Sequence, residues 1–280
     1  MNKPAANIDA VLSGPRRRRL LPSALIVLAA AAAIAAQHKP GDPGRDLARR
    51  VLKAQETSGF QIRARVILGE EEEGARRPAI LQVRMAGRRE GDTEKVLYQV
   101  LYPTTLKGYA AVIEQSRAPG ISGFLFEPPE RIRQLDPDLL KSPFAGTGLT
   151  IEDLAENFWR WPSQRVAGQG QAGKQACTVL ESRPSKDAAT AYALVRSCID
   201  PKKLTPLWVE KFDDAGNRVK RISLEIPERG NRNRDFRVSM VVEGDPSLPR
   251  TRVEILRSDR GIRVSPDEFL VQRLKSLTGR

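Results

Sequence analysis

The feature that most constrains the fold of this chain is a strict alternation of apolar and polar residues in short segments. The first such segment begins at Phe60, and its apolar positions are Ile62, Ala64, Val66 and Leu68. A period of two residues places these side chains on one face of a β-strand. Such alternation is typical of antiparallel strands that bury one face, whereas strands of a parallel sheet are apolar on both faces.

The same pattern recurs along most of the chain after residue 60. The segments that we expect to form strands are 60–68, 79–85, 95–102, 108–114, 122–126, 164–166, 176–182, 191–199, 207–212, 219–226, 236–243 and 252–257. Few of the intervals between them could hold a crossover helix, and residues 213–217 form a strong hairpin signal. We therefore expect a mainly β (α+β) protein with a single strongly curved antiparallel sheet or an open barrel.

Three helices are expected beside the strands. Residues 44–58 place apolar side chains at spacings of three and four, and Gly59 ends this amphipathic helix. Thr150 begins a second helix, with Asp153 three residues later in the arrangement of a capping box. Residues 267–276 form a closing helix that starts after Ser265 and Pro266.

The first residues have the order of an export signal. Arg16 to Arg19 precede an apolar run from Leu20 to Ala36 that ends in small residues. We expect residues 1–36 to be a signal peptide, or an uncleaved N-terminal anchor, because the run is near the lower length limit for a membrane span. Residues 37–43 are a linker and residues 44–280 a single domain. The protein is then expected in the periplasm, free or tethered to the inner membrane.

The chain is strongly basic, with 47 Lys and Arg against 34 Asp and Glu, a net charge of +13. Such a balance favours anionic partners. Because an export signal takes the protein away from nucleic acid, lipid headgroups or acidic partner proteins are the expected anions. An ordinary solvated surface without a dedicated ligand is the alternative.

The two cysteines, Cys177 and Cys198, lie in the exported part, where an oxidising compartment permits a disulfide. The segments 176–182 and 191–199 flank a turn-rich interval. A hairpin that places Cys177 opposite Cys198, and Leu180 opposite Val195, would bring the two thiols together. Two separate buried thiols are the alternative.

No catalytic arrangement is recognisable in the sequence. The single histidine, His38, lies in the linker, and a zinc site would need more His or Cys ligands. The neighbouring carboxylates of Glu152 and Asp153, and of Asp136 and Asp138, are assigned to capping and turns. The glycine-rich run 168–173 is predicted to be a flexible hairpin turn. We expect no metal and no cofactor, and an enzyme of unrecognised chemistry is the minor alternative.

Three stretches carry a resemblance to a known family. They are the proline-broken strand from Phe126 to Arg133, the Gly-Thr loop and Glu-Asp-Leu helix start from Phe144 to Leu154, and the hairpin from Leu207 to Ile222. Together they resemble the outer-membrane lipoprotein-sorting protein family, which is LolA-like. Within that family, the resemblance is to an uncharacterised branch. The chain departs from the family pattern at Gly148-Leu149, where the family usually has Asp-Phe.

The resemblance implies an open, LolA/LolB-like half-barrel whose concave apolar face is covered by helices. It implies a periplasmic carrier or chaperone that binds a lipid or an acylated protein in outer-membrane lipoprotein sorting, without catalysis. The alternative is an envelope sensor or exporter-accessory module that uses the same fold to bind an envelope transport or membrane protein.

The alternation and the resemblance together give candidate ligand-binding residues. Those expected to line an apolar cavity are Val66, Leu68, Leu81, Val83, Met85, Trp159 and Trp208. This facing depends on the register, because a slip of one residue would turn every side chain to the other face. Arg131 and Arg133 are candidates for contact with a headgroup or a partner. Ordinary core packing of the tryptophans and solvation of the arginines are the alternatives.

Overall fold

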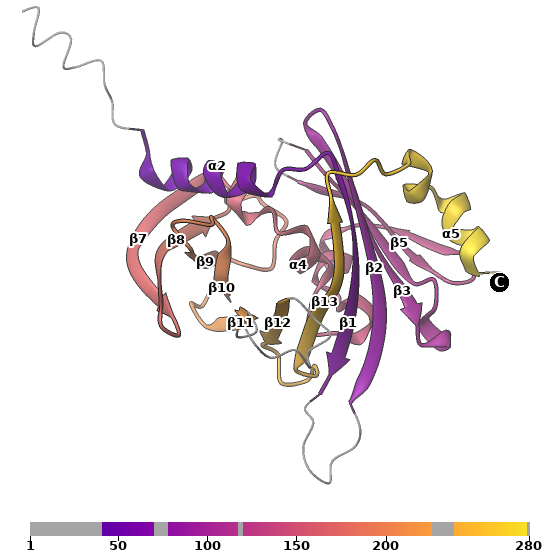
Figure 1. The fold of residues 1–280 in the computed structure, drawn as a ribbon. Helices are drawn as coiled ribbons and strands as arrows, with labels where there is room; N and C mark the ends of the chain where they lie inside the picture. Colours follow the sequence, from indigo (N-terminus) through magenta and orange to yellow (C-terminus); the bar gives the residue numbers. More distant parts are fainter. Residues whose placement is uncertain (1–40, 70–77, 117–119, 226–237, 279–280) are drawn as a thin grey trace, which may run out of the picture. The chain divides into compact units, whose positions relative to one another are not determined.

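The computed structural model describes residues 41–69, 78–116, 120–225 and 238–278 (Figure 1). The predicted signal and His38 lie outside these residues. Within them, thirteen strands form a single sheet. The strands are β1 (Gly59–Leu68), β2 (Ala79–Glu90), β3 (Thr93–Tyr102), β4 (Ala110–Gln115), β5 (Ile121–Glu127), β6 (Arg131–Gln134), β7 (Ser163–Ala172), β8 (Gln175–Arg183), β9 (Leu194–Ile199), β10 (Pro206–Phe212), β11 (Arg218–Glu225), β12 (Val238–Glu243) and β13 (Thr251–Arg260).

The sheet is antiparallel and not closed, which confirms the predicted fold class. Its strand order is β6-β5-β4-β3-β2-β1-β13-β12-β11-β10-β9-β8-β7. The first and last strands therefore pair in the middle of the sheet. Strands β6 and β7, which are consecutive in the chain, lie at its two opposite edges. Strand β7 lies at the left of Figure 1, and β5, next to the other edge, lies on the right.

This strand order forces the connection between β6 and β7 to cross from one edge of the sheet to the other. Residues 135–162, here called the crossover segment, make this connection. They contain α3 (Pro137–Lys141), η2 (Phe144–Gly146), α4 (Ile151–Ala155) and η3 (Asn157–Arg160). Asp136 caps α3, and Thr150 and Asp153 form the predicted capping box at α4.

The crossover segment covers the concave face of the sheet. Its residues Leu139, Phe144 and Ile151 belong to a buried cluster with β1 to β5 and β13. Phe158 and Trp159 belong to a second buried cluster with the strands β8 to β10 and with α2 (Pro43–Gln55). The segment thus joins the two halves of the core.

Helix α2 covers the other part of the concave face. Asp42 caps its first turn, and Leu47, Ala48 and Val51 are buried against the sheet. The helix lies very close to β7, because a Cβ atom on Gly44 would be 2.2 Å from the carbonyl oxygen of Gln164. The absence of a side chain at this position is what allows the contact. The helix ends at Gln55, three residues before the predicted end.

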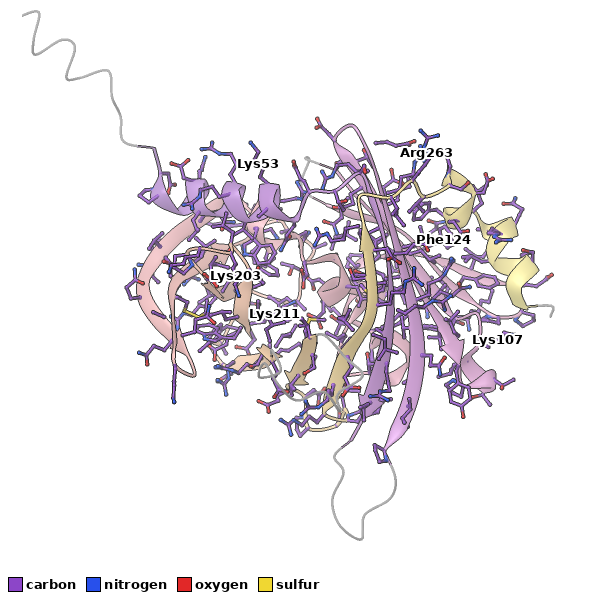
Figure 2. The ribbon with its side chains drawn as sticks, viewed as in Figure 1. Lys53, Lys107, Phe124, Lys203, Lys211 and Arg263 are labelled. Carbon is purple, nitrogen blue, oxygen red and sulfur yellow. A yellow bond between two sulfur atoms is a disulfide. The ribbon has the colours of Figure 1, made fainter. Side chains whose placement is uncertain are left out.

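The convex face carries a smaller core of its own. The closing helix is divided into η4 (Pro266–Phe269) and α5 (Val271–Thr278), where a single helix over 267–276 was predicted. Phe269 and Leu274 pack on Leu97 and Phe126 of the sheet, and Phe124, labelled in Figure 2, packs against this cluster. The two faces of the sheet are therefore covered by different parts of the chain.

The glycine-rich run 168–173 is not the predicted flexible turn. Its first five residues lie in β7 and pair with β8, and only the end of the run takes part in the turn. Gly170 lies opposite Cys177, and a Cβ atom there would be 2.8 Å from Val179 and 3.2 Å from the sulfur of Cys177. A small residue is therefore needed inside the strand, beside the disulfide.

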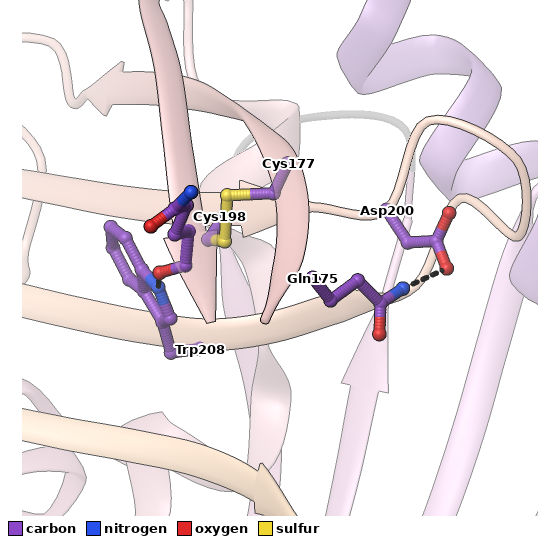
Figure 3. The surroundings of a disulfide bond; sticks show 6 residues. Gln175, Cys177, Cys198, Asp200 and Trp208 are labelled. Atoms are coloured by element: carbon purple, nitrogen blue, oxygen red, sulfur yellow. Dashed lines mark hydrogen bonds between the residues drawn. A yellow bond between two sulfur atoms is a disulfide. The ribbon is translucent and has the colours of Figure 1, made fainter. Parts of the chain in front are cut away.

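Cys177 and Cys198 form a disulfide between β8 and β9 (Figure 3). The predicted register is wrong by two residues, because Val179 lies opposite Cys198 and Leu180 opposite Ser197. The cysteines are diagonal neighbours on one face, with 5.4 Å between their Cα atoms. Trp208 lies beside them.

Removal of this disulfide should lower the stability of the domain. The two cysteines are 21 residues apart. In the chain-entropy description, opening a loop of this size costs about 3 kcal/mol. We expect the variant Cys177→Ala/Cys198→Ala to lose free energy of unfolding by this amount in urea titrations, and added reductant should not change its transition. A loss below about 1 kcal/mol would contradict this view of the crosslink.

Candidate functional site

A cavity of about 440 Å³ lies on the concave face, between the sheet and the crossover segment. Its walls come from β1 to β4, from β11 to β13, from the end of α2 and from the crossover segment. The cavity size is within the range of small-molecule sites. The apolar residues that line it are Leu52, Phe60, Ile62, Ala64, Val66, Val83, Met85, Val96, Tyr98, Phe144, Leu149, Leu154, Ala155, Ile222, Met240, Val242, Val253 and Ile255.

The alternation in β1 and β2 gives the correct facing of the predicted cavity residues. Val66, Val83 and Met85 line the cavity. Leu81 is buried in the adjoining core cluster, and Leu68 packs against that cluster from the end of β1. All five side chains therefore lie on the concave face.

The two tryptophans do not line this cavity, so this part of the prediction needs correction. Trp159 is buried beneath α2 in the second core cluster, because the crossover segment reaches the β7 edge at this point. Trp208 faces the opposite way from its neighbour Val209 and packs beside the disulfide. Its indole nitrogen donates a hydrogen bond to the carbonyl oxygen of Gln171.

Part of the remaining wall comes from strands that the sequence analysis did not assign to the site. Met240 and Val242 of β12, and Val253 and Ile255 of β13, line the cavity. The same two-residue alternation is present in both strands. The missing information was the pairing of β13 with β1, which joins the two ends of the chain.

Polar and charged residues also belong to the lining, namely Gln55, Arg89, Glu94, Gln115, Thr147, Asp153, Glu156, Arg160 and Arg260. Glu156 follows α4 in a left-handed backbone conformation, with φ of 46°, and its exposed side chain lines the cavity. Loss of hydration raises the pKa of this carboxyl, and the positive charge of Lys211 opposes the shift. Arg260 also lines the cavity and donates a hydrogen bond to the carbonyl oxygen of Gln55. The cavity is thus mainly apolar, with charged residues in its lining.

A buried ion cluster fixes the crossover segment to the sheet. The carboxylate of Asp153 contacts the ammonium groups of Lys211, at 2.5 Å, and of Lys220. The exposed fractions of the three side chains are 0%, 2% and 6%. Tyr192 donates to the carboxylate at 2.8 Å, and the backbone amide of Thr150 donates at 2.7 Å. Figure 2 labels Lys211 inside the curved sheet.

This cluster satisfies groups that would otherwise be costly to bury. Isolated charges in a protein interior are strongly unfavourable unless they are paired and hydrogen-bonded. Lys211 also lies over the rings of Tyr192, at 4.7 Å, and Phe158, at 5.5 Å, which adds cation–π attraction. Asp153 and Lys220 come from two of the stretches that carry the family resemblance, and the fold brings them together.

Two of the carboxylates that the sequence analysis assigns to capping and turns, Glu152 and Asp136, have hydrogen-bond partners in the structure. Glu152 accepts hydrogen bonds from the hydroxyl of Thr190 and the amide of Ala191, and burial raises its pKa. Asp136 accepts from the amide of Leu139 at the start of α3. Among the residues that the structure describes, no group of His, Cys, Asp and Glu side chains is arranged to hold a metal ion. No helix in the described ranges is long and apolar enough to cross a membrane.

Arg131 and Arg133 lie on the edge strand β6, outside the cavity. Both guanidinium groups are near the carboxylate of Glu127, at 3.3 and 3.6 Å. Their side chains are largely accessible, so contact with a headgroup or a partner stays a prediction.

A family model described as "Uncharacterized protein" matches residues 92–276, more than half of the chain. No curated protein matches the sequence significantly.

Three solved structures share the fold. A domain described as an outer membrane lipoprotein-sorting protein of Vibrio parahaemolyticus has 18% identity and a TM-score of 0.70, over 83% of this chain and 98% of that one. A DUF1329 family protein from Desulfovibrio piger has 16% identity and a TM-score of 0.71, over 83% and 99%. The LolA superfamily protein NE2245 from Nitrosomonas europaea has 13% identity and a TM-score of 0.56, over 80% and 97%.

Substitution of Asp153 should destabilise the domain severely. The variant Asp153→Asn leaves two buried ammonium groups without a counter-charge, and breaking a buried ion pair in this way costs about 3–5 kcal/mol. We expect this loss in urea unfolding followed by tryptophan fluorescence. The control is Asp214→Asn in the exposed hairpin turn, which should change stability by no more than about 0.5 kcal/mol. Equal effects of the two substitutions would refute the structural role of the cluster.

The contribution of Asp153 should depend on pH in one direction. Burial alone would raise its pKa, but Lys211 and Lys220 hold the pKa well below the ordinary value. A carboxyl of this kind stabilises the fold above its unfolded pKa of about 3.9, and the contribution is lost as the pH falls toward the folded pKa. The stability gap between wild type and Asp153→Asn should therefore be constant from about pH 7 to about 5 and shrink below about pH 4. Unfolding titrations across this range test the expectation, and a gap that grows in acid would contradict it.

Proposed function

The chain belongs to the family of uncharacterised proteins whose model matches residues 92–276 and has a LolA-like fold, and from this premise we propose that it is a carrier or chaperone for a lipid or an acylated protein. It acts in the periplasm, in the sorting of outer-membrane lipoproteins. It catalyses no reaction.

The observation that supports this proposal most directly is the apolar cavity on the concave face. Several of its wall residues, such as Met85, Met240 and Ile255, are partly exposed although they are large and apolar. Burial of one methylene contributes about 0.8 kcal/mol, so a chain of about twelve carbons gains on the order of 10 kcal/mol. Association itself costs about 4–15 kcal/mol, so a well-filled cavity is needed for useful affinity.

The departure from the family pattern at Gly148-Leu149 falls at this cavity. Leu149 lines the wall, and the amide of Gly148 donates a hydrogen bond to the hydroxyl of Thr251. An aliphatic side chain in this place favours an apolar ligand. The loop that resembles the family thus contributes both to the wall and to the anchoring of the crossover segment.

The second candidate function is an envelope sensor or exporter-accessory module that binds a protein partner. Strands β6 and β7, each of which pairs with one other strand within the described residues, favour this alternative, because an edge strand can accept a strand from a partner. The two candidates differ in whether the cavity is occupied in the purified protein.

Mass spectrometry of organic extracts distinguishes these functions. If the protein is a carrier, the mature protein purified from the periplasm should release lipid or acyl chains in near-stoichiometric amount, because the apolar wall retains them. An empty protein that captures an envelope protein in a strand-dependent manner would support the sensor and contradict the carrier.

Two substitutions on opposite faces of β2 test the cavity itself. Val83 lines the cavity, whereas Ile80 of the same strand is on the convex face and 42% exposed. We expect Val83→Glu to remove bound lipid and Ile80→Glu to retain it, because only the first places a charge against the acyl chain. The measurement is the lipid-to-protein ratio in the extracts.

A second variant covers the case in which Val83→Glu does not fold. Met240→Trp/Ile255→Trp fills the cavity with apolar volume and keeps the wall apolar, and Ile80→Trp is its matched control. We expect the filled variant to keep its circular dichroism spectrum and to lose bound lipid. Undiminished lipid in the folded, filled variant would show that lipid binds elsewhere.

A further inference from the structure

Three arginines form a row across the convex face, behind the wall of the cavity. In the antiparallel register, Arg63 of β1 lies directly opposite Arg84 of β2 and directly opposite Arg257 of β13. These strands lie side by side in the centre of Figure 1. The residues that alternate with the arginines, such as Ile62 and Val83, line the cavity on the other face.

The middle arginine of the row has no counter-charge among the described residues. Arg84 pairs with Glu268 at 2.6 Å, and Arg257 pairs with Asp259 at 2.8 Å. The side chain of Arg63 is exposed and forms no such pair. Burial of part of the group and the charge of Arg84 lower its pKa.

This arrangement is unfavourable for folding. Like charges that lie directly opposite one another on neighbouring strands are destabilising. Arg63 faces an arginine on both sides and has no carboxylate of its own within the described ranges, although each of these neighbours pairs with one. An anion at the row would remove this repulsion, because guanidinium groups bind phosphate in a bidentate manner.

The surroundings of the row favour a membrane surface as the source of the anion. Leu256 is the bulged residue beside Arg257, and it is a large apolar side chain that is exposed on the surface. Arg257 is 73% exposed. Cations next to an exposed apolar side chain match an interface at which phosphate groups lie above acyl chains. None of the three arginines lines the cavity on the concave face.

We propose that the row of Arg63, Arg84 and Arg257 is a docking surface for a bilayer that carries anionic lipid headgroups. The two more accessible cations of the row, Arg63 and Arg257, contact the phosphates, and Leu256 enters the interface. Arg84, which forms an ion pair with Glu268, lies beside Arg63 and adds to the positive potential of the row. This inference goes beyond the proposed function, since it concerns the opposite face of the sheet and does not depend on what the cavity binds.

Vesicle flotation tests the proposal with the folded, mature protein. The probes are vesicles of phosphatidylglycerol and phosphatidylcholine in equal parts, and vesicles of phosphatidylcholine alone. We expect binding to the anionic vesicles only, with weaker binding as salt is added. Each arginine that is removed should weaken binding about fivefold, so Arg63→Gln/Arg257→Gln should bind about 25-fold more weakly.

The matched control removes the same charge from another surface. Arg50 and Lys53 are exposed on helix α2, and Arg50→Gln/Lys53→Gln should weaken binding less than about twofold. Equal losses in the two double variants would overturn the proposal, because net charge alone would then explain binding. Absence of binding to anionic vesicles at low salt would also overturn it, and so would full competition by soluble glycerol phosphate, which would identify a free-anion site.

A stability measurement separates docking from a structural role. Because Arg63 lies between two like charges, Arg63→Gln should leave the melting temperature unchanged or raise it, while vesicle binding falls. A variant that binds vesicles normally and melts at a lower temperature would overturn the proposal.

Discussion

The buried carboxylate of Asp153, held between Lys211 and Lys220, is the interaction on which the rest of the structure depends. It joins the one segment that crosses the concave face to two adjacent strands in the β7 half of the sheet. An apolar contact could also hold a helix against a sheet. An ion cluster differs in that it tolerates little displacement, because a shift of either partner leaves a charge buried and unpaired.

The cavity follows from this anchoring. A curved sheet with an apolar concave face would normally fill its hollow with its own side chains, since interiors are packed as densely as organic crystals. The crossover segment is held by Asp153 on one side and by Phe144 and Ile151 in the β1 to β5 half. Its backbone is therefore anchored to both halves of the sheet, and this opposes its collapse onto the strands between them, where the cavity lies. The charge of Glu156 at the lining further opposes closure, because collapse would bury it without a partner.

How far the sequence predicts this arrangement depends on whether a property is local. The facing of Val83 and Met85 is local, because a strand alternates with a period of two, and it is predicted correctly. The hairpin register is not, because a slip of two residues keeps every side chain on its face, and the alternation of residues 176–199 fits both alignments. The position of Trp159 is not local either, because it depends on where the crossover segment meets the far edge of the sheet. That edge is β7, and the pairing of β1 with β13 places it there. The lysines that bind Asp153 are 58 and 67 residues away in the sequence. The capping box already explains why an aspartate follows Thr150 by three residues, so the sequence gives no sign that Asp153 also binds two lysines.

The two faces of the central strands differ in which residues the fold requires. The fold requires the apolar residues of the concave face, because without them the crossover segment and α2 have nothing to pack on. On the convex face of β1 it requires only that the residues be compatible with water, so glutamine or threonine would serve as well as arginine. Residues that reduce stability are expected where another demand outweighs folding. Arg63, which faces arginines on two strands, is such a residue. The net charge of +13 therefore indicates which partners the protein binds, and it does not indicate the fold.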